Sequence, residues 1–457
     1  MKLHPYQKDH VRRLLYALRR DQNVLDASDT GTGKTVTSAV LARLLECPVF
    51  VVCPKAVIPS WERHLKEWAP GRPFGVINYE KLRTGNTGFA GQTVRHYKHK
   101  GKEKKKITFD YRLVENTLFI FDEVHKCKGR NTLNAQLLKD AVNAGYRILA
   151  LSATAAQSPL DLEALGLALG LHRGTNFYPW MMKRGVYKHP LGYLEFPTGT
   201  HRAGTKAAKR VERAKAGLQS IHEDIFRGGR GSRMRIALIP EFPKCLNIAD
   251  SYCFDAKEAR AKFFEYFEFF DKVCDEEYER MLETTGEANM LVEQLRARQE
   301  SELFKLPGLI ELAEDEVATG RSVVIFTQFR LTAEALHQHI EKSGLIIGEQ
   351  DAKIRQAYID RFRDDKIRVL VSTVDAGGTG VDLHDVNGNY PRTSLLCPTY
   401  NAVNYRQAMG RIHRAGSKSP AINKLVFAAG TIEEKVRENV EKKLDRMDLL
   451  NDGDLAY

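Results

Sequence analysis

The sequence lacks paired cysteines, an apolar N-terminal segment and any long apolar run. Its seven cysteines are scattered without a C-x-x-C pair, which excludes a zinc cluster or a disulfide framework and predicts reduced thiols in the core. The first seven residues do not form the apolar core of a signal peptide, and no later stretch is long enough to span a bilayer. We therefore expect a soluble intracellular protein without a membrane partner.

Low-complexity composition is also absent. Hydrophobic residues make up 43% of the chain and charged residues 28%, a balance that excludes a largely disordered protein. Because 457 residues exceed what one hydrophobic core usually supports, we expect two or three domains.

Acidic residues are scarce in two segments. The location of these basic segments says more about possible binding partners than the net charge of +12 does. Residues 95–106 contain seven Lys or Arg and one Glu, and residues 172–235 contain fourteen Lys or Arg and four acids. Residues 251–317 are acidic instead, which argues against a nucleic-acid groove there. Each basic segment is a candidate phosphate-binding surface, because neutralising a polyanion releases its counterions. A loop kept in solution by its charge explains either segment equally well.

The most informative motif is the glycine turn at residues 27–35, between a short apolar run and a helical pattern at 36–45. A strand, a glycine turn and a helix in this order let backbone N–H groups and a helix N-terminus face phosphate oxygens. Lys34 would reach the β- and γ-phosphates, and Thr35 would hold Mg²⁺. The P-loop pattern has Gly where this chain has Ser28.

Two later apolar runs end in residues with useful chemistry. The run at 117–121 leads into Asp122 and Glu123, and adjacent carboxylates near a P-loop suit a division of roles. Asp122 would order the Mg²⁺ shell, and Glu123 would orient and deprotonate the attacking water. A further run, at 147–154, ends in two hydroxyls.

Strand and helix patterns alternate up to about residue 170. The expected elements are strands at 48–54 and 76–80 and amphipathic helices at 7–20 and 55–68. The tryptophans of the second helix are expected in the core. The lysine-rich stretch 84–108 interrupts them as an inserted loop or hairpin would. This alternation predicts a parallel sheet covered on both faces, with its ligand at the carboxyl ends of the strands.

A second alternation begins at Ser322. The expected strands lie at 323–326, 369–371, 395–397 and 425–427. Between the two alternations, residues 172–235 show no regular pattern and residues 257–318 are strongly helix-forming. The glycine-rich turn at 376–382 lacks a Gly-Lys-Ser/Thr ending, so we expect no nucleotide site of its own in this half.

One helical face of this second half carries Gln407, Arg411 and Arg414. Arginines three residues apart on a helix can point together at one phosphate, and a solvated helix face is the alternative.

Together these motifs resemble those of the superfamily II helicases, and most closely their Swi/Snf-type branch of ATP-dependent DNA translocases. Eight motifs occur in the family's order over nearly the whole chain. They are the adenine-reading Q motif at 3–7, motif I at 27–35, motif Ia at 52–61, motif II at 122–125, motif III at 152–154, motif IV at 323–329, motif V at 376–383 and motif VI at 407–416, and residues 431–435 are similar to the closing helix. Ser152-Ala153-Thr154, Asp382 and Gly410 are closer to general superfamily II helicases.

The resemblance implies an α/β fold of two tandem RecA-like parallel-sheet lobes with basic and helical insertions. Lobe 1 would span 1–170, with a basic insertion at about 84–112. A basic linker and helical insertion would span 171–305, and lobe 2, with arginine fingers and a closing helix, 306–457.

The implied cofactors are ATP and Mg²⁺. The implied catalytic residues are Lys34, Asp122, Glu123, Arg411 and Arg414. The implied nucleotide-binding residues are Gln7, Asp29, Thr30, Gly31, Thr32, Gly33, Lys34, Thr35, Gly380, Asp382 and Gln407, with Mg²⁺ at Thr35 and Asp122. The implied nucleic-acid contacts are Lys55, Gln328, Thr373, Gly377 and Gly378.

The function we expect is that of a monomeric ATP-driven motor, in a bacterial or phage-infected cytoplasm, that moves along DNA and remodels it, with branched DNA among the candidate substrates. DNA is favoured over RNA. No long segment tipped by an aromatic residue is evident as a separation wedge, so we expect remodelling and not processive unwinding. The alternatives are an RNA-directed helicase with the same core and a nucleotide-switched DNA clamp that does not translocate.

Overall fold

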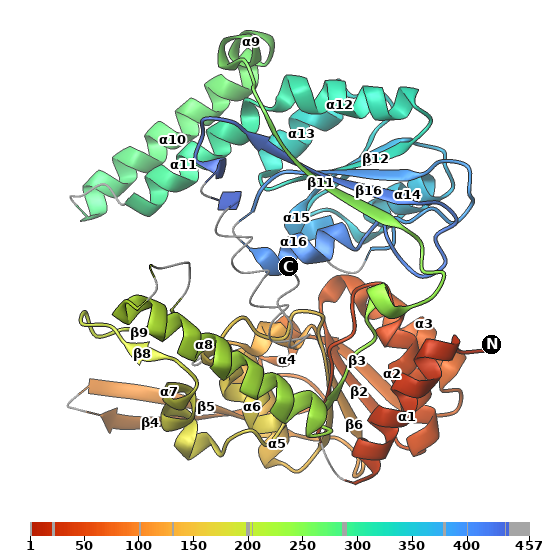
Figure 1. The fold of residues 1–457 in the computed structure, drawn as a ribbon, viewed down its shortest axis with the longest axis vertical. Coiled ribbons are helices and arrows are strands. Elements are labelled where there is room, and N and C mark those ends of the chain that lie inside the picture. Colours follow the sequence, from red (N-terminus) through yellow and green to blue (C-terminus); the bar gives the residue numbers. More distant parts are fainter. Residues whose placement is uncertain are drawn as a thin grey trace. The chain divides into compact units, whose positions relative to one another are not determined.

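The computed structural model describes residues 2–20, 23–99, 102–129, 132–197, 202, 204–285, 290–377, 381–399, 401–434 and 436–437. The chain divides into two compact units, of which the first extends to Pro240 and the second begins at Glu241 (Figure 1). Each unit is built around one parallel sheet. Among the described helices, none is long and apolar enough to cross a bilayer.

The sheet of the first unit has the strand order β10-β1-β7-β6-β2-β3, and every neighbouring pair is parallel. Its strands are β1 (Val24–Asp26), β2 (Val49–Cys53), β3 (Phe74–Asn78), β6 (Leu118–Asp122), β7 (Arg147–Leu151) and β10 (Gly231–Ser232). The helices of this unit are α1 (Pro5–Arg19), α2 (Lys34–Leu45), α3 (Ile58–Trp68), α4 (Tyr79–Leu82), α5 (Leu133–Asn143), α6 (Glu163–Ala168), α7 (Phe177–Lys183) and α8 (Lys206–His222).

Helices cover both faces of this sheet, as the apolar runs predict. Alternate side chains of the central strand β2 point to opposite faces. Val49, Val51 and Cys53 pack with α1, α2 and α3, whereas Phe50 and Val52 pack with α5, α6 and α8. The parallel α/β fold expected from the sequence is confirmed for this unit.

The lysine-rich insertion is a hairpin of two ten-residue strands, β4 (Ala90–His99) and β5 (Lys102–Tyr111). Phe109 is buried near the base of the hairpin, and Tyr97, near its other end, is 48% exposed. A long exposed segment with an aromatic residue near its end is therefore present, which the sequence analysis did not foresee. A second, very short hairpin is formed by β8 (Tyr187–Lys188) and β9 (Leu194–Glu195).

The middle of the chain corrects the domain boundaries drawn from the sequence, which set residues 171–305 apart as a linker and insertion. The segment that seemed patternless contains α8 and β10, and β10 pairs with β1 in the first sheet. The next strand, β11 (Cys245–Tyr252), belongs to the second sheet. The sequence gives little sign of this, because α8 buries only one small stripe of side chains and β10 has two residues.

The second unit has the sheet order β11-β16-β15-β12-β14-β13, again parallel throughout. Its strands after β11 are β12 (Ser322–Thr327), β13 (Gly344–Ile346), β14 (Val369–Thr373), β15 (Arg392–Leu396) and β16 (Ala421–Ala428). Its helices are α9 (Ala256–Lys262), α10 (Phe264–Thr285), α11 (Met290–Leu303), α12 (Leu306–Ala318), α13 (Arg330–His339), α14 (Ala352–Arg363), α15 (Val374–Gly377) and α16 (Ala402–Met409). The four strands predicted here are confirmed, and β11 and β13 are additional.

A buried ion pair joins the residue before α12 to the segment that follows β16. Lys305 Nζ lies 2.7 Å from Glu433 Oε1, and both side chains are almost fully buried. Glu433 Oε2 also accepts a hydrogen bond from the backbone N–H of Ala428, at the end of β16. The Glu433 of the predicted closing segment therefore anchors that segment to the second sheet, whereas Lys435 of the same segment lies outside the described residues.

Candidate active site

The P-loop turn joins the end of β1 to the start of α2. Gly31 and Gly33 have φ angles of 83° and 94°, in the left-handed region that favours glycine. A Cβ on Gly33 would lie 2.5 Å from Gln7 Nε2, so a side chain there would also displace the end of the Gln7 side chain. The turn brings the N-terminus of α2, with Lys34 and Thr35 in its first turn, to the carboxyl end of β1.

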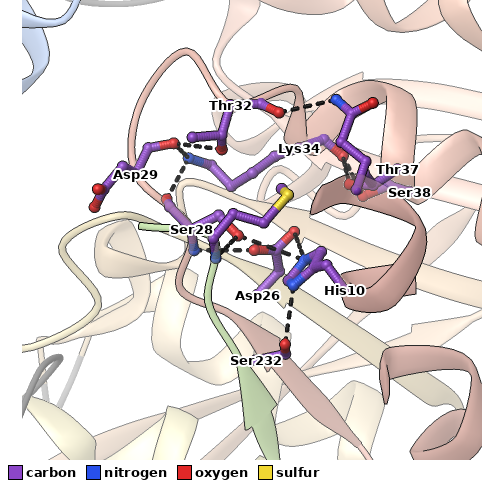
Figure 2. A network of polar contacts seen from close by, with 11 residues as sticks. His10, Asp26, Ser28, Asp29, Thr32, Lys34, Thr37, Ser38 and Ser232 are labelled. Atoms are coloured by element: carbon purple, nitrogen blue, oxygen red, sulfur yellow. Dashed lines mark hydrogen bonds and ion pairs between the residues drawn. The ribbon is translucent and has the colours of Figure 1, made fainter. Parts of the chain in front are cut away.

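The Lys34 side chain lies inside this loop (Figure 2). Its Nζ donates to the backbone oxygens of Ser28 and Asp29, at 2.8 and 3.1 Å. Thr32 Oγ1 donates to the same Asp29 oxygen at 2.8 Å and closes the turn that includes Thr30. The ammonium group is thus held where the sequence predicts phosphates, and a nucleotide would have to compete with two carbonyl groups for it.

Gln7 reaches the loop from the first turn of α1. Its Nε2 donates to the backbone oxygen of Thr32 at 3.0 Å, and its Oε1 accepts from the backbone N–H of His4 at 3.0 Å. Both ends of the amide are therefore already engaged, although an amide nitrogen has a second hydrogen and its oxygen a second lone pair. The structure brings Gln7 to the P-loop, and its contact with adenine remains a prediction.

Ser28, the departure from the P-loop pattern, has a local explanation. Its side chain is fully buried, and its hydroxyl accepts a hydrogen bond from the backbone N–H of Met234 at 2.9 Å. The hydroxyl also lies 3.4 Å from His10 Nε2. Ser28 therefore links the P-loop to the residues that follow β10, a link that glycine could not make.

Asp29 makes the same connection more strongly. Its Oδ1 lies 2.6 Å from Arg233 Nη2, its Oδ2 accepts from the backbone N–H of Ile236 at 2.8 Å, and its own N–H donates to the Met234 oxygen at 3.0 Å. These contacts use the carboxylate and the amide that the sequence analysis assigned to the nucleotide. In the structure Asp29 anchors the segment after β10, and its contact with the nucleotide remains a prediction.

A buried polar chain supports the loop from below (Figure 2). His10 Nε2 lies 3.0 Å from Asp26 Oδ2, and His10 Nδ1 lies 2.9 Å from Ser232 Oγ. Burial alone would raise the pKa of Asp26, but His10 holds it below its ordinary value. Asp26 Oδ1 in turn accepts from the N–H of Ser28 at 2.9 Å, so α1, β1 and β10 together fix the start of the loop.

The predicted carboxylate pair lies at the end of β6. Asp122 Oδ2 accepts from Trp61 Nε1 at 2.8 Å, and the Asp122 backbone oxygen accepts from Tyr79 Oη at 2.8 Å. Trp61 is buried, as expected of a core residue, yet its indole N–H also positions this carboxylate. The helical spacing of Trp61 does not indicate that role, although a buried tryptophan N–H usually needs a partner.

Glu123 has a φ of 53°, an uncommon left-handed conformation for a residue other than glycine. Its Oε2 lies 3.3 Å from His125 Nδ1, and the same nitrogen lies 3.2 Å from Ser152 Oγ. The predicted motifs II and III are therefore in direct contact, and His125 orients the glutamate.

Burial and the neighbouring charge of Glu123 raise the pKa of Asp122 to about 7, whereas Trp61 and Lys34 oppose that shift. A buried carboxylate whose charge is incompletely balanced is a suitable ligand for a divalent cation, since the cation would stabilise the charged form. The donor set at this edge therefore fits Mg²⁺.

The arginines of the second unit lie in a different backbone context from the one predicted. Helix α16 ends at Met409, with Gly410 as its C-cap, so Arg411 and Arg414 follow the helix and do not share its face. Glycine is a poor helix former, and the backbone oxygen of Arg411 accepts a hydrogen bond from the N–H of Leu383.

These two arginines nevertheless converge on one loop. Arg414 Nη1 lies 2.7 Å from Asp382 Oδ1, its Nη2 donates to the Val381 oxygen at 3.2 Å, and Arg411 Nη1 approaches the same oxygen at 3.4 Å. Burial would raise the pKa of Asp382, but Arg414 and then Arg411 hold it below its ordinary value. Asp382, predicted as a nucleotide ligand, therefore holds Arg414 in this structure.

The other residues predicted to bind nucleotide or nucleic acid make fewer contacts with the motifs described above. Gln407 is buried, and its Nε2 has no partner among the described residues. Thr373 ends β14, and a Cβ on Gly377 would lie 2.3 Å from Ser372 Oγ, so the last position of α15 needs glycine. Lys55 is exposed directly after β2, and Gln328 follows β12. Gly378 and Gly380 lie outside the described residues.

Two family models match the chain, one in each unit. The model for the type III restriction enzyme res subunit matches residues 1–157, and the model for the helicase conserved C-terminal domain matches residues 305–416. The first match contains the P-loop and the Asp122–Glu123 pair, and the second contains the two arginines.

Relatives of known description align over almost the entire chain. A putative ATP-dependent RNA helicase, L364, of Acanthamoeba polyphaga mimivirus is 30% identical over 99% of this chain and 84% of its own length. A Caenorhabditis elegans homologue of SWI/SNF-related matrix-associated actin-dependent regulator of chromatin subfamily A-like protein 1 is 24% identical over 97% of this chain, which spans 61% of that protein. Among solved structures, the Sulfolobus solfataricus SWI2/SNF2 ATPase core in complex with dsDNA aligns at 18% identity with a TM-score of 0.37, over 99% of this chain and 94% of its own.

The motifs, their placement at the carboxyl ends of two parallel sheets and these sequence relatives agree. The chain belongs to the Swi/Snf-type helicases of superfamily II, which are ATP-hydrolysing enzymes that bind nucleic acid.

Proposed function

We propose that this protein is a monomeric ATP-dependent motor that moves along DNA and remodels it, with branched DNA among its substrates. One observation carries the proposal: the P-loop of the first unit holds Lys34 close enough to the Asp122–Glu123 pair for its charge to lower the pKa of Asp122. These residues have the chemistry that phosphoryl transfer to water requires.

In this mechanism Lys34 leaves its two carbonyl partners and binds the β- and γ-phosphates. Glu123, oriented by His125, accepts the proton of the attacking water. Thr35 and Asp122 would hold Mg²⁺, which neutralises phosphate charge when it is bound. Hydrolysis would then change how tightly nucleic acid is bound by Lys55, Gln328 and the segment that follows β14.

Arg411 and Arg414 are the proposed arginine fingers, which stabilise charge that develops on the transferred phosphate. Arg414→Ala should lower the turnover number for ATP by about 10³-fold or more, while ATP still binds to the first unit. Steady-state ATPase assays and equilibrium binding of a fluorescent ATP analogue measure the two quantities. Lys418→Ala, which removes an exposed charge four residues away, is the matched control. Unchanged turnover in Arg414→Ala would remove this residue from the active site.

The β4–β5 hairpin is the proposed phosphate-binding surface of the first unit. Arg95 lies opposite Lys106, and Tyr97 lies opposite Lys104, so these four side chains share one face. All four are exposed. Like charges placed opposite each other destabilise a hairpin, which favours a surface whose charges are neutralised by an anion over a loop that is merely solvated.

Neutralising this face should weaken nucleic-acid binding equally for all sequences, because phosphate contacts carry no base information. For Lys104→Gln with Lys106→Gln, we expect the slope of log affinity against log salt concentration to fall by about 2. The matched control is Lys98→Gln with Lys105→Gln, which removes two charges from the other face of the same hairpin. Fluorescence anisotropy over a salt series gives the slopes. Equal slopes for wild type and both variants would show that the hairpin is a solvated segment and does not bind phosphates.

RNA is the specific alternative to DNA as the substrate, since the mimivirus relative is described as a putative RNA helicase. Measuring ATPase rates with duplex DNA, single-stranded DNA, forked DNA and RNA separates the candidates. We expect duplex DNA to stimulate the rate at least as well as single strands, and RNA to stimulate it weakly. Stimulation by RNA alone would favour the RNA-directed helicase, and DNA binding without multiple-turnover hydrolysis would favour the nucleotide-switched clamp.

A further inference from the structure

A cavity of about 490 Å³ in the first unit is bounded by α1 and by the segment that includes β10. Among the described residues that line it there is no aspartate or glutamate. The side chains that define its chemistry are four arginines and two aromatic rings: Arg13, Arg20, Arg233, Arg235, Tyr16 and Phe226. An anion is the ligand that such a lining favours.

One wall of the cavity is a face of α1. Arg13 and Tyr16, three residues apart, share that face, and Arg20, the C-cap of α1, follows at its end. Arg20 Nη1 donates to Tyr16 Oη at 2.9 Å, and the Tyr16 ring is 65% exposed. No described carboxylate forms an ion pair with Arg13 or Arg20. Guanidinium groups recognise phosphates, and an exposed aromatic ring offers a stacking surface to a base.

The opposite wall is the segment that holds the P-loop. Arg233 pairs with Asp29, Ser232 contacts His10, and the residue after Arg233 donates its N–H to Ser28. A ligand that moves this wall would therefore act on the loop that holds Lys34, without contacting the nucleotide site itself. Residues 232–236 are the physical connection between the cavity and the loop.

We propose that this cavity binds phosphates of a nucleic-acid strand and that its occupancy is transmitted to the P-loop through residues 232–236. The inference rests on the proposed function, because it names where the strand would act on ATP hydrolysis. Arg13 and Arg20 contact the strand, and Arg233 is a positioning residue that acts through Asp29.

The test compares two double variants in α1 and its C-cap residue. Arg13→Ala with Arg20→Ala removes the cavity charges, whereas Arg12→Ala with Arg19→Ala removes two exposed charges that do not line the cavity. The probe is a fluorescein-labelled 20-nucleotide DNA strand, titrated over a salt series. We expect the first variant alone to bind the strand about tenfold more weakly, with a salt slope lower by about 2, and to show a smaller stimulation of ATPase by saturating strand.

Two further measurements make the outcome decisive. Arg13→Lys with Arg20→Lys keeps both charges and should restore most of the affinity and stimulation, and thermal unfolding midpoints confirm that each variant is folded. Equal affinity, slope and stimulation in the two alanine variants would overturn the inference. So would loss of fluorescent ADP binding by the cavity variant together with an unchanged affinity for the strand. Failure of the wild type to bind any nucleic acid would instead count against the proposed function.

Discussion

Glu123→Gln should bind ATP and lose nearly all turnover. The amide keeps the shape and hydrogen-bonding capacity of the side chain, but it cannot accept the proton of the attacking water. Since a positioned general base contributes about 10²- to 10⁴-fold, we expect the turnover number to fall by that factor. The measurements are phosphate release at saturating ATP and the dissociation constant of ATP.

The control for this variant is Glu115→Gln, the same chemical change at an exposed position shortly before β6. It should leave both quantities unchanged. A Glu123→Gln protein that does not bind ATP would show that the glutamate is structural, through its unusual backbone conformation and its contact with His125. A variant with nearly normal turnover would exclude Glu123 as the base.

Lys34→Ala should abolish measurable hydrolysis while nucleic-acid binding without ATP persists. The substitution removes the charge that would stabilise the β- and γ-phosphates, and loss of a single preorganised donor of this kind costs about 10²- to 10³-fold in the turnover number. The oxygens of Ser28 and Asp29 lose their hydrogen bonds to Nζ, so the thermal unfolding midpoint must be compared as well. Lys66→Ala, an exposed lysine on α3, is the matched control.

A Lys34→Ala protein with near-normal ATPase would show that the P-loop assignment is wrong. A folded variant that had lost both ATPase and DNA binding would mean that the loop serves the nucleic-acid surface as well. We expect the two activities to separate in this variant.

The sequence predicted those parts of the fold whose signal is local. Buried parallel strands such as β2 and β12 are continuous apolar runs, because both faces of the sheet are covered. The glycine spacing of the P-loop and the carboxylates at the end of β6 are equally local, since turn geometry and strand ends are decided by a few adjacent residues. These features locate most of the candidate active site.

The parts that could not be predicted depend on pairing between distant segments. Arg233 is 204 residues from Asp29 in the sequence, and nothing near either residue indicates their ion pair. Trp61 lies 61 residues before Asp122, and its spacing on α3 identifies it only as a core residue. The end of α16 at Met409 was missed for a related reason: the backbone after Gly410 bonds to Leu383 and does not continue the helix.

Movement along duplex DNA is the central claim, and displacement of a third strand tests it most directly. A triplex-forming oligonucleotide is bound to a long duplex, the protein is loaded at a distance, and release of the oligonucleotide is followed with ATP, with ADP and with the Lys34→Ala variant. We predict release only with ATP and the wild-type protein, while the duplex remains paired. Absence of triplex release, together with ATP-dependent separation of a long forked duplex and no ATPase response to intact duplex, would contradict the claim and identify a conventional unwinding helicase.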